Sequence, residues 1–275
     1  MKGTLFLVAT PIGNLEDITY RAVRILKEVD LILAEDTRQT LKLLNQLEIS
    51  KPLETYHRHN EEEKQGEIIQ KLLEGKSIAL VTDAGTPGIS DPGEVLVKEA
   101  IKNDISIVPI PGACALINAL VCSGLSTEKF SFYGFLPQNK NNRREVLSQI
   151  RNDKKTCILY EAPHKLIETL KELEKRVEDR SCVVAKELTK IHETFYRGKI
   201  SDILEKIKEP KGEYIILVEG NNLIEENALN EMSLEEHYNY YKGLGFDKKE
   251  IIKSIAKDRN VKKDEIYKYF IEKGK

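Results

Sequence analysis

Three short segments rich in glycine, proline and other small residues each follow an apolar, partly β-branched segment. They are Ala9–Leu15 (ATPIGNL), Thr82–Gly88 (TDAGTPG) and Pro111–Ala115 (PGACA). In open parallel sheets, ligands bind beyond the carboxyl ends of the strands, and small residues there let a ligand touch the backbone directly. One such turn alone is more often an ordinary strand-to-helix connection. Three together predict a binding crevice for a small molecule.

The sequence lacks the standard nucleotide-binding motifs. No G-x-G-x-x-G follows the first apolar segment. Gly75-Lys76-Ser77 resembles only the tail of a P-loop, because position 70 is Gln and the triplet precedes a strand. No Ser–His–Asp or Cys–His set can be identified from spacing. The sequence therefore does not predict a phosphate-binding loop or a hydrolytic triad.

Two groups of titratable residues allow alternative interpretations. In His57–Glu61 (HRHNE) two histidines at i and i+2 face the same way only on a strand, and no third ligand is evident. A solvated loop or a substrate contact is therefore favoured over a metal site. Asp83 and Asp91 could be paired catalytic carboxylates, but Asp91-Pro92 is also a common start of a turn. The remaining histidines are isolated, which favours structural roles: His164, His192 and His237.

Eight apolar segments bounded by turn residues are predicted to be strands. They are Leu5–Ala9, Leu31–Ala34, Ile78–Val81, Ile105–Ile110, Phe130–Phe135, Cys157–Tyr160, Cys182–Ala185 and Tyr214–Val218. Amphipathic patterns between them predict helices at 18–29, 68–73, 95–102, 143–150, 166–177 and 203–207. This alternation predicts an α/β architecture with mostly parallel sheets. Near-continuous apolar strands predict sheets that are covered on both faces.

The length of 275 residues and the distribution of charge predict more than one domain. A joint near Pro111–Ala113 divides the α/β part into domains at 1–112 and 113–220. Residues 221–241 contain five Glu, including Glu225 and Glu226, and no Lys or Arg, whereas residues 242–275 contain eleven Lys and Arg against six acids. This shift predicts a boundary near Gly220 and a separate segment at 221–275.

Residues 221–275 are predicted to contain three short helices. Ser233 with Glu236 and Asp247 with Glu250 have the spacing of capping boxes. Gly243 and Gly245 separate the first two helices, and Arg259-Asn260 separates the second from the third. Six residues at helical spacing can form a small core: Ile251, Ile252, Ile255, Ile266, Tyr269 and Phe270.

Composition excludes several classes of protein. No run approaches the roughly 18 apolar residues of a membrane span, and the opening apolar segment is too short for a signal peptide. The four cysteines stand far apart, which fits neither a disulfide framework nor paired metal ligands. A soluble, cytoplasmic protein is expected.

Five longer motifs carry a resemblance to a known family. They are Leu7–Tyr20, which begins LVATPIGN, Ala34–Arg38 (AEDTR), Asp83–Gly93 (DAGTPGISDPG), Gly134–Pro137 (GFLP) and Lys186–Thr189 (KELT). Collinear over residues 4–220, they resemble the bacterial 16S ribosomal RNA (cytidine-2′-O)-methyltransferases of the tetrapyrrole methylase superfamily. The final helices resemble the small helical domain of such proteins. Thr82 and Cys114 stand where Ser is more familiar, and both keep a small side chain.

The resemblance implies two α/β domains of the tetrapyrrole methylase type, with S-adenosyl-L-methionine bound in the cleft between them, and a small C-terminal three-helix domain. It also implies a homodimer and 2′-O-methylation of the cytidine at position 1402 of 16S rRNA in the small ribosomal subunit, a reaction that requires no metal. Small side chains and backbone carbonyls suit the adenine and sulfonium of this cofactor. By motif position the cofactor-binding residues are Pro11, Asp83, Ala84, Gly85, Thr86, Gly88, Ala113, Cys114, Tyr160, Ala185, Tyr214 and Ile215.

Methyl transfer to a ribose hydroxyl depends on positioning and benefits from a base. The candidate catalytic residues are Asp36, Arg38, Lys186 and Glu187. Lys186 would act as a base if burial depressed its pKa, and Arg38 would hold a phosphate. The alternatives are a surface ion pair at Lys186–Glu187 and a capped helix start at Glu35–Arg38.

The basic C-terminal helices are predicted to bind RNA phosphates. The candidate RNA-binding residues are Lys248, Lys249, Lys253, Lys257, Arg259, Lys262 and Lys263. A solvated helical cap or a dimer contact is the alternative. Two rival functions remain at this point: a porphyrinoid methylase of the same superfamily, and a ligand-sensing DNA-binding protein whose final helices form a helix-turn-helix.

Overall fold

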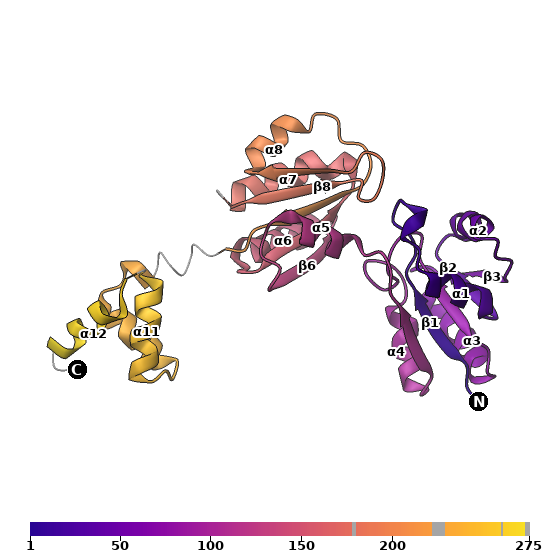
Figure 1. Ribbon diagram of the computed structural model, residues 1–275, viewed down its shortest axis with the longest axis horizontal. Coiled ribbons are helices and arrows are strands. Elements are labelled where there is room, and N and C mark those ends of the chain that lie inside the picture. The colour runs from indigo at the N-terminus through magenta and orange to yellow at the C-terminus, as the bar shows by residue number, and fades with distance from the viewer. Residues whose placement is uncertain (178–179, 222–228, 260, 273–275) are drawn as a thin grey trace.

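The computed structural model describes residues 1–177, 180–221, 229–259 and 261–272. Figure 1 shows two α/β parts, each built on one sheet, followed by a group of C-terminal helices. Glu225 and Glu226 of the acidic segment and Asn260 of the predicted break between two helices lie outside the described residues.

The first sheet contains five parallel strands in the order β3-β2-β4-β1-β5. The strands are β1 (Thr4–Val8), β2 (Leu31–Ala34), β3 (Leu53–Thr55), β4 (Ile78–Val81) and β5 (Ser106–Ile110). Helices α1 (Tyr20–Glu28), α2 (Thr37–Gln46), α3 (Glu61–Leu73) and α4 (Glu94–Lys102) connect them, with a short 3-10 helix η1 at Leu15–Asp17. Because all five strands are parallel, their carboxyl ends meet at one edge of the sheet.

Each face of this sheet packs on a pair of helices. Leu31 and Leu33 of β2 lie in a buried cluster with α3 and α4, whereas Ile32 and Ala34 lie in a cluster with α1 and α2. Successive side chains of a strand point to opposite faces, so a strand that is covered on both sides must be apolar throughout. The prediction of doubly covered strands is confirmed here.

The second sheet also has five strands, in the order β6-β7-β10-β8-β9. They are β6 (Phe130–Phe135), β7 (Thr156–Glu161), β8 (Cys182–Lys186), β9 (Thr194–Gly198) and β10 (Tyr214–Val218). Only β6 and β7 pair in parallel; β10 pairs antiparallel with both β7 and β8, and β8 pairs antiparallel with β9. The expectation of mostly parallel sheets is therefore wrong for this half of the molecule.

The error arises at β9, which the sequence pattern did not reveal. Its residues Thr194–Gly198 (TFYRG) are only partly buried, because β9 is an edge strand. A short segment joins β8 to β9, and two strands joined in this way pair antiparallel. Without β9, the apolar segments at 182–185 and 214–218 look like another parallel strand–helix–strand unit.

Helices also cover both faces of the second sheet. The helices α6 (Lys140–Asn152), α7 (Pro163–Val177) and α8 (Ile200–Lys206) pack on one face. On the other face α5 (Ala115–Ser123) packs together with Ile12, which comes from the loop after β1 of the first sheet. This shared cluster joins the two α/β parts. The domain limits at residues 112 and 220 stay predictions.

The C-terminal helices are α10 (Leu234–Gly243), α11 (Lys248–Asp258) and α12 (Lys263–Glu272), which confirms three short helices. Both capping boxes are present, at Ser233 with Glu236 and at Asp247 with Glu250. The helices have a buried core of their own: Ile251, Ile252, Ile255, Ala256, Ile266 and Phe270.

None of the helices in the described part of the chain is long and apolar enough to cross a membrane. All four cysteines are free thiols.

Candidate active site

A cavity of about 360 Å³ lies between the carboxyl edge of the first sheet and one end of the second. From the first sheet it is lined by loops that follow β1, β4 and β5. From the second it is lined by the ends of β6, β7 and β8 and by the start of β10. The lining residues are Ile12, Ala84, Gly85, Thr86, Ile89, Ser90, Asp91, Cys114, Ala115, Phe135, Tyr160, Glu161, Ala162, Pro163, Ala185, Leu188, Glu213, Tyr214 and Ile215.

The loop after β4 forms one wall of the cavity through backbone pairing with the loop after β1. The amide of Thr10 donates to the carbonyl of Gly85 at 2.9 Å, and the amide of Gly85 donates back to Thr10 at 3.1 Å. Gly85 has a φ of +89°, and a Cβ atom there would stand 3.3 Å from Cγ2 of Ile12. Only glycine adopts this backbone without strain. The sequence thus places bare backbone at the cavity wall.

Hydrogen bonds and aromatic contacts hold the adjoining walls. The hydroxyl of Thr86 donates to the carbonyl of Ala113 at 3.1 Å, which ties the loop after β4 to the loop after β5. The hydroxyl of Tyr160 accepts from the amide of Leu116 at 3.2 Å. The ring of Phe135 stands edge-on to Tyr160 with 5.7 Å between centroids, and its side chain is 57% exposed. A large apolar ring is therefore left open at the rim of the cavity.

Three carboxylates line the cavity, and two of them have partners. Glu161 accepts from the amide of Ala162 at 2.9 Å and from the hydroxyl of Thr169 at 2.5 Å. Glu213 forms an ion pair with Lys190 at 2.9 Å. Among the residues that the structure describes, none donates a hydrogen bond to the carboxylate of Asp91.

Asp91 lies beside other charged groups from the carboxyl edge of the first sheet. Burial raises its pKa to about 7; the charges of Glu35 and Asp83 add to the shift, and the charge of Arg58 opposes it. The pKa values of Glu35 and Asp83 are also raised, in each case chiefly by burial. The residues 35–36, 57–58 and 83–91 follow β2, β3 and β4, so parallel topology alone brings these distant segments together.

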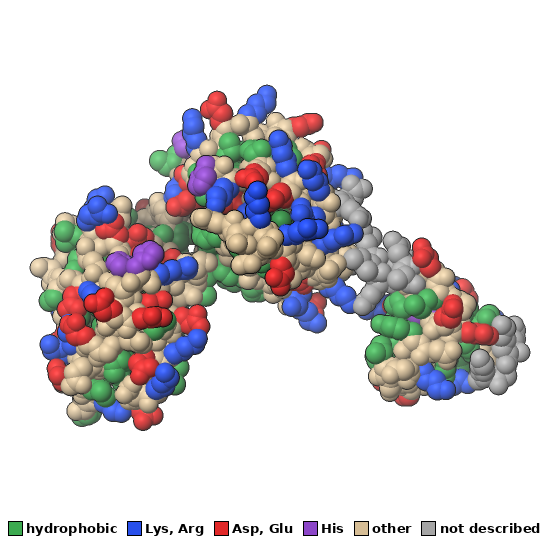
Figure 2. All heavy atoms as spheres, turned by 180° about the vertical axis from the view of Figure 1, so that it is seen from behind, with side chains coloured by type: hydrophobic (Ala, Val, Ile, Leu, Met, Phe, Trp, Pro, Cys, Tyr) green, Lys and Arg blue, Asp and Glu red, His purple; other side chains and the backbone are tan. Residues whose placement is uncertain are grey.

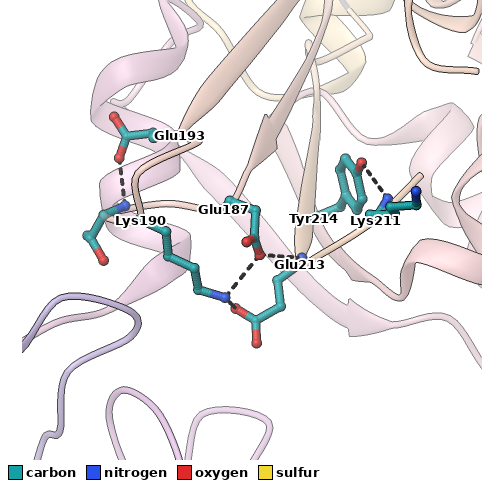
Figure 3. A network of polar contacts seen from close by, with 7 residues as sticks. Glu187, Lys190, Glu193, Lys211, Glu213 and Tyr214 are labelled. Atoms are coloured by element: carbon teal, nitrogen blue, oxygen red, sulfur yellow. Dashed lines mark hydrogen bonds and ion pairs between the residues drawn. The ribbon is translucent and has the colours of Figure 1, made fainter. Parts of the chain in front are cut away.

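A polar network beside the cavity involves the segment after β8 (Figure 3). Nζ of Lys190 bonds Oε1 of Glu187 and Oε2 of Glu213, each at 2.9 Å. The same Glu187 oxygen accepts from the amide of Glu213 at 2.9 Å. A Cβ atom at Gly13 would stand 2.4 Å from Cγ of Lys190, so the lysine stem lies directly on the loop after β1. This network fixes the wall at Glu213 and joins the two α/β parts.

The structure brings together most of the residues predicted to bind the cofactor. Eight of them line the cavity: Ala84, Gly85, Thr86, Cys114, Tyr160, Ala185, Tyr214 and Ile215. Four do not: Pro11, Asp83, Gly88 and Ala113. Asp83 accepts from the amide of Asp36 at 3.1 Å, and the carbonyl of Ala113 is used by Thr86. These two residues shape the loops that form the wall.

None of the four predicted catalytic residues lines the cavity. Asp36 is the N-cap of α2 and holds Arg38 through two side-chain bonds at 3.0 and 2.7 Å, which lower the pKa of Asp36 to about 2. Burial raises the pKa of Glu187, but hydrogen bonds from Lys190 and the amide of Glu213 bring it below its ordinary value. Lys186 is the last residue of β8, paired with Tyr214 across the sheet.

Sequence reasoning did not place Phe135, Glu161 or Glu213 at the site, and it left Asp91 open between catalysis and a turn. Phe135 stands within the GFLP motif and Asp91 within DAGTPGISDPG, so both motifs contained a usable signal. Glu161 is the last residue of β7 and Glu213 directly precedes β10, in the sheet whose strands were expected to be mostly parallel. Their convergence could be found only from the antiparallel pairing of β7 and β10.

Most of the residues predicted to bind RNA are exposed, on α11, at the start of α12 or directly before it. These are Lys248, Lys249, Lys253, Lys257, Lys262 and Lys263. Arg259 differs, because its side chain is partly buried and turned inward. Its Nε donates to Nδ1 of His237 at 3.3 Å, and its NH2 group donates to the carbonyls of Met232 and Leu229. These acceptors hold the guanidinium of Arg259 against the helices, and its predicted role in RNA binding stays a prediction.

No group of three or more metal-ligating side chains occurs within the described residues that could hold a metal ion. His57 and His59 have ring centroids 5.9 Å apart.

Comparison with known proteins adds sequence and fold relatives. Residues 4–204 match the sequence profile of the tetrapyrrole (corrin/porphyrin) methylases. A protein of Halalkalibacterium halodurans named ribosomal RNA small subunit methyltransferase I is 49% identical over 274 residues, which cover 98% of this chain and 95% of that protein. A protein of the same name from Thermotoga maritima is 44% identical over 220 residues, which cover 79% of this chain and 99% of that protein.

Among solved structures, the fold resembles uroporphyrin-III C-methyl transferase from Thermus thermophilus complexed with S-adenyl homocysteine. The TM-score is 0.56 at 16% identity, covering 79% of this chain and 97% of that chain.

Proposed function

Because the chain belongs to the tetrapyrrole (corrin/porphyrin) methylase family, we propose that it methylates 16S ribosomal RNA. The methyl donor is S-adenosyl-L-methionine, and the acceptor is the ribose 2′-oxygen of a cytidine, at position 1402, in the small subunit. The cavity between the two sheets carries this proposal, because the loops that hold the most specific sequence motifs converge there.

The residues of the cavity fit the methyl donor. A volume of about 360 Å³ and a mainly apolar wall are typical of small-molecule sites. Ala84, Gly85 and Ala185 leave backbone accessible to an adenosine, and the carboxylates of Asp91, Glu161 and Glu213 favour positively charged groups. When bound, the donor supplies an electrophilic methyl group. The protein orients the donor and its acceptor and excludes water from the space between them.

Relatives support RNA as the acceptor. Proteins that align with nearly the whole of this chain are named ribosomal RNA small subunit methyltransferase I. The exposed Phe135 ring at the rim offers an aromatic surface on which an unstacked base can lie. Choice of the cytidine and of its 2′-oxygen is the finer part of the proposal, and it rests on the motif resemblance.

We assign the C-terminal helices a docking role. Their exposed lysines provide positive charge on a chain whose net charge is −2, and phosphates attract such a surface. In the view of Figure 2, blue side chains gather at the lower edge of these helices. The Thermotoga maritima relative bears the same name although 220 residues cover 99% of it. The helices therefore serve substrate affinity in this proposal, and the chemistry belongs to the α/β parts.

We further propose that the protein acts in the cytoplasm as a homodimer. Ile117 and Val121 on α5 are 41% and 63% exposed, and apolar side chains at one exposed face are typical of a subunit contact. Light scattering on the full chain tests the dimer, and a monomer at micromolar concentration contradicts it.

The decisive experiment incubates the protein with S-adenosyl-L-methionine labelled in its methyl group and small ribosomal subunits that lack the modification. We expect label in 16S rRNA, and nuclease digestion followed by mass spectrometry should recover 2′-O-methylcytidine. Naked 16S rRNA in a parallel reaction distinguishes free RNA from the assembled particle as substrate.

Parallel reactions separate the rival functions. Label in an added uroporphyrinogen but not in RNA would favour a porphyrinoid methylase. Binding of the methyl donor without transfer to any acceptor, together with binding to duplex DNA, would favour the ligand-sensing alternative.

A further inference from the structure

One side of α6 carries a strip of positive charge that the fold does not neutralise. Lys140, Arg144 and Arg151 are all exposed. At about 100° of rotation per residue they lie within about 40° of one another around the helix axis, so they form one line along α6. Within the described part of the chain, none of these three side chains takes part in an ion pair. We call this set of three residues the α6 strip.

Arg143, the neighbour of Arg144, shows by contrast how an arginine of the same helix serves the fold. Its Nε lies 2.7 Å from Oε2 of Glu172, and its Nη2 donates to the hydroxyl of Thr169 at 2.7 Å. Both partners belong to α7, and the side chain of Arg143 is only 12% exposed. Arg143 therefore holds α6 against α7, whereas the side chains of the α6 strip are left to solvent.

The arrangement of these charges costs helix stability. Residues 136–155 contain six Lys and Arg against two acids. The helix begins with Lys140 and has no acid in its first turn, although the N-terminus of a helix favours negative charge. Lys140 and Arg144 also stand four residues apart, where like charges repel. The stability of α6 therefore does not explain the α6 strip, whereas an anionic partner would relieve both penalties.

The two ends of α6 show where the α6 strip runs. The helix begins five residues after Phe135, and the side chain of Asn139 fixes this start by accepting from two backbone amides at 3.0 and 3.3 Å. At the other end, the carbonyl of Arg151 accepts from the side chain of Asn221 at 2.8 Å. Asn221 ends the described range 180–221. The α6 strip therefore extends from the rim of the cavity to the residue from which the chain continues to the C-terminal helices.

We propose that the α6 strip binds the phosphate backbone of the RNA next to the nucleotide that is methylated. This inference rests on the proposed function. From Lys140 to Arg151 the helix rises about 16 Å, which matches about five successive phosphates of one stacked strand. Arginine binds phosphate through two parallel N–H bonds, and lysine supplies a point charge. RNA held in this way lies along α6 with one end at the exposed ring of Phe135.

An RNA strand fits the α6 strip better than a membrane surface does. A helix that lies on a membrane combines a basic face with apolar side chains that insert into the lipid. The exposed positions beside the α6 strip on the same helix are instead polar: Asn141, Ser148 and Asn152. A line of charges without an apolar face is suited to a linear chain of phosphates.

The test removes the three charges together in the full chain, as Lys140→Gln, Arg144→Gln and Arg151→Gln. Binding to small ribosomal subunits that lack the modification is measured at several salt concentrations. Three lost phosphate contacts should reduce the slope of log affinity against log salt by about two, and should weaken binding about tenfold or more at physiological salt. Calorimetric affinity for S-adenosyl-L-methionine should stay unchanged, which shows that the cavity is intact.

Two further variants control for net charge and for damage to α6. Changing Lys27, Lys76 and Lys208 to Gln removes the same charge from exposed positions elsewhere and should leave the salt dependence unchanged. Replacing Arg144 and Arg151 by Lys keeps the charge of the α6 strip and should keep most of the salt dependence.

Cross-linking gives a readout that does not depend on affinity. A photoreactive amino acid at Ser148, beside the α6 strip, should cross-link to 16S rRNA in the bound particle. Gln149 is also exposed but lies about 100° further round the helix, so the same group there is the matched control and should cross-link much less.

The possible results are distinct. If the unaltered chain transfers no methyl group to RNA, the proposed function fails and this inference fails with it. If the unaltered chain methylates RNA but the triple Gln variant of the α6 strip keeps the full salt dependence, the inference is overturned and the proposed function stands. Equal weakening in the Lys27, Lys76 and Lys208 variant, equal cross-linking from Ser148 and Gln149, or loss of donor binding in the strip variant also overturns it. Binding to anionic phospholipid vesicles that is lost with the α6 strip, while RNA binding is kept, would assign the strip to a membrane instead.

Discussion

Two aspartates, one in the cavity and one in the C-terminal helices, show how differently the two regions use the same side chain. Asp258 accepts from Nε2 of His237 at 3.0 Å and from the hydroxyl of Tyr241 at 2.6 Å. Asp91 accepts nothing from the described residues around it. A buried polar group with all its partners holds structure in place, whereas one without them is available for chemistry.

The same contrast extends to the glycines of the two regions. Gly85 in the cavity has a positive φ and a close neighbour in Ile12. Gly245, between α10 and α11, has a φ of +85° and no atom within 4 Å of an added Cβ. At Gly85 the absence of a side chain lets neighbouring groups lie close to the cavity backbone. At Gly245 the glycine only allows the chain to turn between the two helices. The α/β parts are therefore expected to hold the chemistry and the helices to hold the substrate.

The largest effect is expected from Gly85→Leu, which should abolish binding of S-adenosyl-L-methionine. The new side chain is strained at a φ of +89° and projects toward Ile12 at the cavity wall. Gly245→Leu is the matched control, because it imposes similar strain outside the cavity and should leave donor binding unchanged. Calorimetry on both variants checks the prediction, and unchanged donor binding in Gly85→Leu would contradict the location of the site.

Removal of the C-terminal helices should reduce methylation of ribosomal particles about tenfold or more while donor affinity stays the same. The shortened chain should end at Asn221, because its amide and side chain bond the carbonyls of Asp153 and Arg151 at 2.7 and 2.8 Å. Full activity of this chain would refute the docking role.

Charge reversal at Lys262 and Lys263 tests docking without removing the fold. Changing both to Glu should weaken RNA binding and flatten its dependence on salt. Reversing the exposed Lys27 and Lys76 of the first α/β part makes the same change in net charge and should have little effect. An equal loss of RNA binding in both double variants would indicate that net charge alone determines the binding.

The sequence predicts a structural element of this molecule when the residue pattern that marks the element lies within the element itself. Strands that are covered on both faces are continuous apolar runs, so the first sheet follows from sequence except for β3, whose three residues are too few for a pattern. The capping boxes of α10 and α11 are likewise local and were found. The direction of β10 depends on β9, a partly polar edge strand, and no local pattern marks it.

The residues of the site divide in the same way, into those that a local motif marks and those whose partners are distant in sequence. Gly85, Thr86 and Tyr160 were predicted because conspicuous motifs or strand ends carry them, and they do line the cavity. Asp91 was left open because its partners are separated from it in sequence and meet only through the parallel sheet. The inward contacts of Arg259 were not predicted, because helical periodicity does not reveal acceptors from the preceding segment at Leu229 and Met232.

Arg259→Ala should destabilise the C-terminal helices by about 1–3 kcal/mol, since the carbonyl of Met232 and Nδ1 of His237 would lose their donor. Amide hydrogen exchange in the full chain measures this as faster exchange in α10 and α11. Lys257→Ala, at an exposed position of α11, is the control and should leave exchange unchanged while weakening RNA binding. Unchanged exchange in Arg259→Ala would contradict the structural role of Arg259 and would favour its predicted contact with RNA.

The smallest effect concerns pH and is confined to the helices. Burial lowers the pKa of His237; the positive charge of Arg259 adds to this effect, and Asp258 opposes it. The folded helices therefore bind fewer protons than the unfolded chain below the ordinary histidine pKa of about 6.5, and their stability must fall as the pH drops through that value. Amide exchange in α10 and α11 should accelerate at acid pH relative to β1 of the same molecule, after correction for intrinsic rates. His237→Gln, which cannot gain a proton, should remove this difference. If acid still reduces the protection of these amides in His237→Gln, the pH dependence belongs to another titratable group.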